Sequence, residues 1–271
     1  MTKIEQPDVK HPKVASRADW LGARKELLAE EKKLTRARDA LNAKRRELPW
    51  VRVEKEYIFD TPHGEMTLAG LFDGRSQLIV KHFMLGPDWK EGCVGCSFEV
   101  DHVEGALVHL EQHDVSYVAV SRAPLADIEA FKRRMGWRFK WVSSERSDFN
   151  FDYHVSFTPE EAASGKVYYN YEVRDFVSDE LSGLSVFYKD EDGQVFHTYS
   201  SYGRGTEETV GAYMYLDITP KGRNENGPRH DLTDWVRHHD KYGHGGFVEH
   251  TGRYVAAGDS ASCCHSENQT A

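Results

Sequence analysis

The apolar residues in the first fifth of the chain recur with the period of a helix. Between residues 14 and 49 they stand seven positions apart, at Trp20, Leu27, Leu34, Leu41 and Leu48. This period places them on one face of a helix. Pro49 ends it, because the residue before a proline resists helical geometry. The stripe is narrow and suits a seam against one other element, either a partner subunit or the rest of the chain.

From residue 50 onward, short apolar runs alternate with helical spacings. Residues 76–85, 116–121 and 138–144 read as strands. Turn residues at 62–64 and at 192–193 predict two hairpins. Residues 98–115 have the spacing of one helix, and 124–136 begin with proline and end with glycine, as helices do. The order predicts an α/β fold with a mixed sheet flanked by helices.

The remaining segments give weaker patterns. Residues 145–183 predict little beyond loops, and 206–220 predict a helix capped by Thr206. We therefore divide the chain into a disordered leader (1–13), an amphipathic helical arm (14–49), an α/β domain (50–242) and a flexible tail rich in Gly, Ser and His (243–271).

Charge separates the arm from the body. The chain carries a net charge of −9, but residues 1–50 carry +5 and the remainder −14. A basic arm on an acidic body favours self-association through residues 20–48 or contact with an acidic partner, unless the arm is simply a solvated helical face. The acidic balance gives no bulk reason to bind nucleic acid or an anionic membrane. Without a long apolar run or a secretory leader, a cytoplasmic protein is expected.

The segment GPDWKEGCVGCSFEVD, residues 86–101, carries the chemistry that stands out most. Cys93 and Cys96 follow a predicted strand and open a predicted helix, whose first N–H groups stabilise a thiolate. The pKa of Cys93 is expected to fall below the usual value of about 8.5, toward about 7. Cys96 is placed to close a disulfide. Gly95 lets the backbone bend, and Gly92 leaves Cys93 open to a partner.

Several long blocks carry a resemblance to a known family. They include residues 57–98 around the cysteines, VAVSRAPLADIEAFKRRMGW and SVFYKDEDGQVFHTYSSYGRG. From about residue 14 to 243 the chain resembles a bacterial thioredoxin-like family of uncharacterised function, described as predicted dithiol-disulfide oxidoreductases. The resemblance implies a thioredoxin-like fold with an N-terminal β-hairpin extension. It also implies that Cys93 is the attacking thiol and Cys96 the resolving thiol.

The chain departs from ordinary thioredoxins near the cysteines. Their attacking cysteine directly follows a tryptophan, whereas Trp89 stands four residues before Cys93. Their cis-proline has no counterpart here, and Gly183 stands at that place. His82, on the strand that leads to the cysteines, either faces the site or packs in the core.

Three other functions compete with thiol–disulfide exchange on a protein or small thiol partner. A metal site would need ligands from the tail, such as Cys263, Cys264 and His265, because one C-x-x-C gives only two of the four zinc ligands. A peroxiredoxin-like peroxidase would carry threonine where Lys90 stands. A non-catalytic scaffold would assemble through the helical arm. In a purely structural alternative, the two cysteines are inert core residues. No pattern indicates a nucleotide, a flavin or another cofactor.

Overall fold

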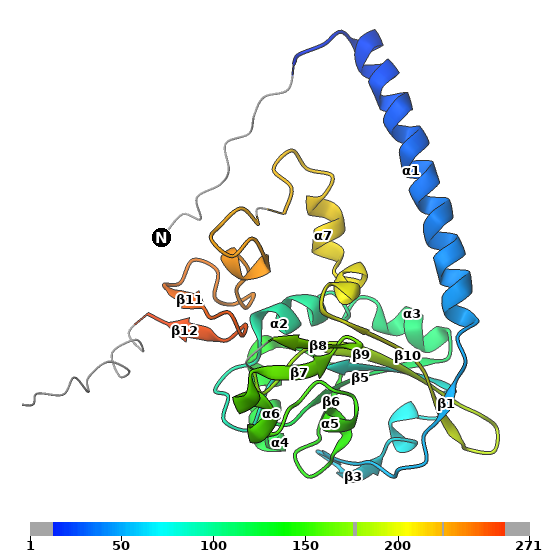
Figure 1. Cartoon of the computed structure of the whole chain (residues 1–271), viewed down its shortest axis with the longest axis vertical. Coiled ribbons are helices and arrows are strands. Elements are labelled where there is room, and N and C mark those ends of the chain that lie inside the picture. Colours follow the sequence, from blue (N-terminus) through cyan, green and yellow to red (C-terminus); the bar gives the residue numbers. More distant parts are fainter. Residues whose placement is uncertain (1–12, 176–177, 224, 258–271) are drawn as a thin grey trace, which may run out of the picture.

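The computed structural model describes residues 13–175, 178–223 and 225–257. Nearly all of the predicted leader therefore lies outside the described residues. Helix α1 (Arg17–Arg46) begins after Ser16, whose hydroxyl oxygen accepts a hydrogen bond from the Asp19 N–H at 3.1 Å. None of its residues is buried, and it stands away from the body (Figure 1). The described part of the chain leaves the apolar stripe uncovered, so packing of the stripe against the body, one of its two interpretations, is wrong for these residues.

An eight-stranded mixed sheet forms the body, in the order β1-β10-β9-β4-β5-β6-β2-β3. Strands β4 and β5 pair in parallel, as do β5 and β6, and the other neighbours are antiparallel. The strands span Val51–Arg52 (β1), Ile58–Thr61 (β2), Gly64–Thr67 (β3), Gln77–His82 (β4), Val115–Ser121 (β5), Lys140–Ser143 (β6), Gly183–Lys189 (β9) and Val195–Tyr202 (β10).

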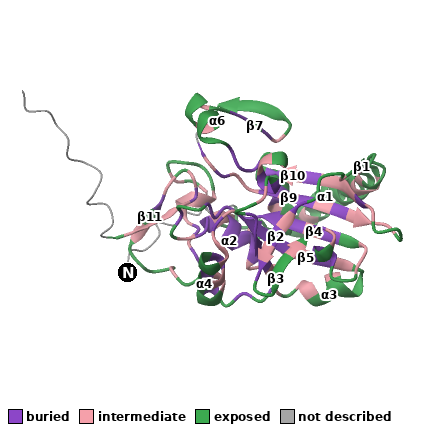
Figure 2. Ribbon diagram, turned by 90° about the horizontal axis from the view of Figure 1, so that it is seen from below, coloured by how far each residue is buried: buried purple, intermediate pink, exposed green. Residues whose placement is uncertain are grey.

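The central strand β4 divides the core between two faces, because successive side chains of a strand point to opposite sides. Leu78 and Val80 pack on the side of the short helices η1 (Gly70–Phe72) and α5 (Phe149–Asp152). Phe83, just after the strand, packs on the other side with α2 (Val94–Val100) and α4 (Leu125–Met135). Figure 2 shows that the central strands of the sheet, such as β4 and β9, are largely buried.

This arrangement is a thioredoxin-like fold. The unit β4–α2–β5 carries the cysteines at its first loop, and the antiparallel hairpin β9–β10 pairs with the other edge of β4. The hairpin β2–β3 joins the far edge of the sheet through Asp60 and Ser143, and is the N-terminal extension that the resemblance implied. Among the described residues, no helix has both the length and the apolar character needed to cross a membrane.

Two sequence predictions in the middle of the chain are wrong. Residues 98–115 form not one helix but the end of α2, a turned segment and a second helix α3 (Leu107–Gln112). Residues 145–183 contain α5, α6 (Pro159–Ser164) and a separate hairpin, β7 (Lys166–Tyr169) with β8 (Glu172–Asp175). Thr158 and Glu161 form a capping box that starts α6, a signal present in the sequence and missed.

The C-terminal predictions also need correction. Thr206 does not cap a helix; it lies in the 3₁₀ segment η2 (Gly203–Thr209), and α7 (Gly211–Leu216) starts after Val210. The tail from residue 243 is not simply flexible. Strands β11 (Gly246–Val248) and β12 (Tyr254–Ala256) form a hairpin that follows η3 (Leu232–Asp234) and lies beside α2 (Figure 1). The rest of the predicted tail, 258–271, lies outside the described residues.

Candidate functional site

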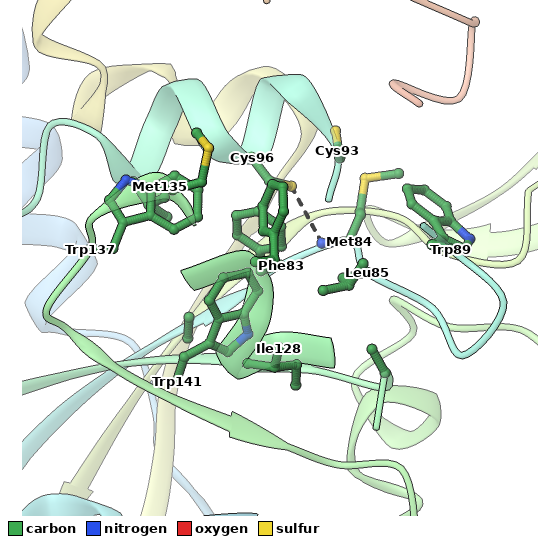
Figure 3. Close-up of a cluster of buried hydrophobic side chains, with 14 of the residues drawn as sticks. Phe83, Met84, Leu85, Trp89, Cys93, Cys96, Ile128, Met135, Trp137 and Trp141 are labelled. Atoms are coloured by element: carbon green, nitrogen blue, oxygen red, sulfur yellow. Dashed lines mark hydrogen bonds between the residues drawn. The ribbon is translucent and has the colours of Figure 1, made fainter. Parts of the chain in front are cut away.

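The two cysteines lie at the start of α2 and are tied to the loop that follows β4. The Cys93 N–H donates to the carbonyl oxygen of Met84 at 3.0 Å. In return, the Met84 N–H donates to the sulfur of Cys96 at 3.5 Å (Figure 3). These reciprocal bonds fix the start of the helix against the end of the strand, so that both sulfurs lie at one edge of the core.

The surroundings of the two sulfurs push their pKa values in opposite directions. The pKa of Cys93 falls to about 7, first because the Cys96 thiol donates a hydrogen bond to its thiolate. The N–H groups of Cys96 and Gly95 and the charge of Lys81 add to this effect, while burial opposes it. Burial, together with the Cys93 thiolate, raises the pKa of Cys96. As the pH rises above about 7, the pair therefore shifts toward one thiolate and one thiol, the two forms that thiol–disulfide exchange uses.

A buried ion pair lies beneath the cysteines and was missed from the sequence. The ammonium of Lys81, on β4, contacts the carboxylate of Glu99, three residues after Cys96 on α2. Burial disfavours the Lys81 charge, but Glu99 and the two cysteines outweigh it and raise the pKa of Lys81. The Thr206 hydroxyl also donates to Glu99, at 3.2 Å. A lysine inside the apolar run LIVKHF was the available signal, because lysine is almost never fully buried unless paired.

The prediction that Gly92 leaves Cys93 open is wrong. Cys93 is only 6% exposed and Cys96 only 2%. Gly92 is required for a different reason: a β-carbon there would lie 2.5 Å from the ring of Phe83 and 2.8 Å from that of Phe131. Its lack of a side chain lets the loop pack against these rings, and so places Cys93 inside the protein.

The C-terminal hairpin covers the sulfur of Cys93. The N–H of Val94, at the first turn of α2, donates to the Gly252 carbonyl oxygen at 3.0 Å. Gly252 has a positive φ of 85°, and a β-carbon there would lie 2.6 Å from the Cys93 sulfur. This turn between β11 and β12 was part of the predicted flexible tail. Its place over the site depends on tertiary packing and has no local signal in the sequence.

The other residues predicted near the cysteines hold the surrounding loops together. The Trp89 indole is buried, donates to Asp179 at 3.2 Å and lies 4.1 Å beneath the guanidinium of Arg253. Trp89 thus joins the loop before Cys93 to the C-terminal hairpin. Gly95 lies against Leu232, whose Cδ1 would be 3.3 Å from an added β-carbon.

His82 and Gly183 lie near the cysteines in the chain or the sheet but contribute less directly. His82 points to the opposite face of the sheet, where its Nε2 and the Ser185 hydroxyl are 2.8 Å apart and its ring stacks on Phe149. Burial lowers the pKa of His82 to about 3, so the ring is neutral. Gly183 pairs with His82 and packs against Tyr202; its neighbours Leu181 and Ser182, rather than Gly183, line the cavity beside Cys93.

His238 is a further residue that the sequence did not single out. Its ring is fully buried, and Nε2 lies 2.8 Å from the carbonyl oxygen of Gly92. Because a carbonyl oxygen only accepts, Nε2 carries the hydrogen. His238 thereby positions the peptide group directly before Cys93.

The predicted metal ligands Cys263, Cys264 and His265 lie outside the described residues. Within the described ranges, no cluster of three or more His, Cys, Asp or Glu side chains is arranged to hold a metal ion.

Comparisons with known proteins show the family of this chain but not its activity. A family model described as "Bacterial protein of unknown function (DUF899)" matches residues 9–242. No curated protein matches the chain. Among solved structures, peroxidoxin BcpB from Mycobacterium tuberculosis is 11% identical with a TM-score of 0.41, covering 62% of this chain and 97% of its own. Peroxiredoxin Q from Xanthomonas campestris is 14% identical with a TM-score of 0.39, covering 60% and 91%. These identities are too low to transfer an activity.

Proposed function

The chain belongs to the bacterial family of unknown function DUF899, so its activity is inferred from its site. We propose that Cys93 and Cys96 exchange between the dithiol and the disulfide form by reaction with a disulfide or thiol partner. One observation carries the proposal. The Cys93 sulfur receives hydrogen bonds from the Cys96 thiol and from backbone N–H groups, with the Lys81 ammonium close by, and its pKa is lowered to about 7. A thiolate with a resolving thiol at its side is the arrangement that disulfide exchange requires.

In the proposed reaction, the Cys93 thiolate attacks one sulfur of a disulfide and expels the other as a thiolate. Cys96 then loses its proton to the departing thiolate, attacks the Cys93 sulfur and expels the second thiol. The protein ends with a Cys93–Cys96 disulfide, and the disulfide substrate ends as two thiols. Lys81 stabilises the thiolates formed along the way, because the low dielectric of the interior strengthens its field. Run backwards, the same steps oxidise a dithiol.

The direct test is a redox titration. A chain carrying Cys263→Ser and Cys264→Ser, so that only two thiols remain, is equilibrated in defined glutathione buffers, alkylated and weighed by mass spectrometry. We expect a reversible loss of two hydrogens from the pair. Cys93→Ser and Cys96→Ser variants serve as controls and should form only mixed disulfides. A pair that stays fully reduced across physiological potentials contradicts the proposal.

Self-association through α1 is proposed as a second property of the molecule. The observation that favours it is the uncovered stripe, in which Leu34 is 69% exposed and Leu27 54% exposed. The occupant that fits is a second copy of α1 in antiparallel orientation. Residues 17–31 carry a net charge of −1 and residues 32–46 carry +6, so antiparallel pairing sets unlike halves side by side. A cytoplasmic location stays a prediction.

A further inference from the structure

A cavity of about 310 Å³ lies next to the cysteines. Both Cys93 and Cys96 line it, so a molecule inside it meets the reactive sulfur. Its volume is at the lower end of the range of about 300–1,000 Å³ that small-molecule sites occupy. A compact ligand would therefore fill it.

The roof of this cavity comes from the C-terminal part of the chain. Leu232 and Thr233 form one part of it, and Thr251 and Gly252 form another. Behind the roof, Val248 packs in a cluster with Val94 and Phe98 of α2. Arg253 extends the attachment, since it stacks on Trp89 and pairs with Asp179 at 3.2 Å. The cover is thus held by apolar packing, a backbone hydrogen bond and an ion pair.

This cover bears on the kind of disulfide that can react. In-line attack needs the substrate sulfur to approach the Cys93 sulfur closely, and this side chain is 6% exposed. A disulfide in a folded protein brings bulky flanking chain with it, which would meet the turn at Gly252. A small disulfide already inside the cavity meets no such obstacle.

The cavity walls also select for charge. Phe98, Leu181, Val210, Tyr213 and Leu232 give most of the wall an apolar character. Arg204 and Glu207 line it too, as an ion pair at 2.8 Å, and Asp231 adds a further carboxylate. A charged ligand would lose its hydration in this largely apolar site, and an anion would also meet the Asp231 carboxylate, so an uncharged ligand is favoured.

We infer that the substrate of the Cys93–Cys96 pair is a compact, uncharged organic disulfide with apolar substituents, or the thiols derived from it, rather than a disulfide of a folded protein. This inference rests on the proposed function. The half-reaction balances as one disulfide plus two cysteine thiols giving two small thiols plus the Cys93–Cys96 disulfide. A small dithiol, such as dithiothreitol, restores the reduced pair.

The test compares three oxidants of the reduced chain carrying Cys263→Ser and Cys264→Ser: diethyl disulfide, dithiodiglycolate and insulin. Each second-order rate constant is divided by that of free dithiothreitol with the same oxidant, which removes differences in intrinsic reactivity. We expect the normalised rate constant of diethyl disulfide to exceed that of the dianionic dithiodiglycolate by about tenfold or more. It should exceed that of insulin by a larger factor. Equal or faster oxidation by insulin overturns the inference while leaving disulfide exchange intact. A pair that no disulfide oxidises contradicts the proposed function itself.

The role of the cover is tested with two matched glycine variants. Gly252→Ala and Gly243→Ala both put a side chain at a positive φ, of 85° and 84°, but only the first would contact Cys93, because a β-carbon at Gly243 meets no atom within 4 Å. We expect Gly252→Ala to change the ratio of the insulin and diethyl disulfide rates by about threefold or more relative to Gly243→Ala. Ratios that agree within a factor of about two would show that the turn does not govern access.

Discussion

At the scale of single residues, the site depends on how charge is shared around one sulfur. Both sulfurs are buried, but Cys93 accepts hydrogen bonds from the Cys96 thiol and from backbone N–H groups, which lower its pKa. For Cys96, burial and the Cys93 thiolate outweigh the help of Lys81 and the Met84 N–H, and its pKa is raised. Under the proposed function, this difference makes Cys93 the attacking sulfur and Cys96 the resolving sulfur.

The first prediction concerns the pH dependence of Cys93. Its pKa lies at about 7, below the usual value of about 8.5, so the thiolate is lost as the pH falls through about 7. The rate of alkylation by iodoacetamide should therefore rise with pH and level off above about 8, in the chain with Cys96, Cys263 and Cys264 left in place and the modified residue identified by mass spectrometry. In Cys96→Ser the midpoint should shift, because the donated hydrogen bond changes. A midpoint near 9 in the unchanged chain would contradict the assignment.

The second prediction concerns the Lys81–Glu99 pair. Lys81→Met leaves a buried carboxylate without its partner, and we expect the free energy of unfolding to fall by about 3–5 kcal/mol. The double variant Lys81→Met/Glu99→Gln should recover part of that loss, as measured by urea denaturation. Arg174→Met, which breaks the exposed pair with Glu172, is the matched control and should cost less than about 1 kcal/mol. Equal losses of unfolding free energy for Lys81→Met and the control would contradict a buried, stabilising Lys81–Glu99 pair.

At the scale of elements, the helix α1 and the C-terminal hairpin differ both in the strength of their sequence patterns and in their contact with the site. The helix has a strong sequence pattern, but none of its residues is buried by the described part of the chain, and its stripe lies open. The hairpin has a weak sequence pattern yet covers Cys93. A strong local pattern therefore does not by itself mark an element that lies at the site.

The third prediction tests antiparallel pairing of α1. Leu34→Glu places a charge at the centre of the stripe and should turn a dimer into a monomer in light scattering, whereas Ala29→Glu, on the opposite helix face, should not. Orientation is read from single cysteines in a chain whose own four are replaced by serine. Leu34→Cys lies on the stripe at its midpoint and should cross-link to itself, while Ala23→Cys should not. Cross-linking at position 23 would indicate a parallel pair, and a monomeric parent chain would contradict self-association.

At the scale of the whole molecule, the arm and the body are loosely joined. The end of α1 reaches the body through Arg45, whose guanidinium lies 5.0 Å from the ring of Tyr199. The sheet, the cysteines and the C-terminal cover instead form one continuous set of contacts, in which Val94, Val236 and Val248 belong to a single apolar cluster. For this reason, the thiol reactivity of Cys93 should not depend on self-association through α1.

The fourth prediction follows from that separation. A chain that begins at Pro49 loses a helix with no buried residue, so its melting temperature should change by less than about 3 °C. Alkylation of Cys93 should proceed at an unchanged rate, and the particle should be monomeric. Loss of thiol reactivity on this truncation would show that α1 supports the site directly.

The sequence patterns by themselves determined an α/β fold with a mixed sheet, the long helix, the main strands and the pair of thiols at a strand-to-helix junction, because each has a local signature in periodicity, turn residues or cysteine spacing. The family resemblance added that the fold is thioredoxin-like. Only the tertiary structure decided that Cys93 is covered, that Lys81 and Glu99 meet beneath it, and that His238 and Gly252 come from more than a hundred residues away to close the site. Such contacts depend on where separate segments end in space, and a buried lysine or a glycine turn does not state its partner. For the same reason the sequence placed His82 beside the cysteines in the chain, whereas the alternation of β4 turned it to the opposite face of the sheet.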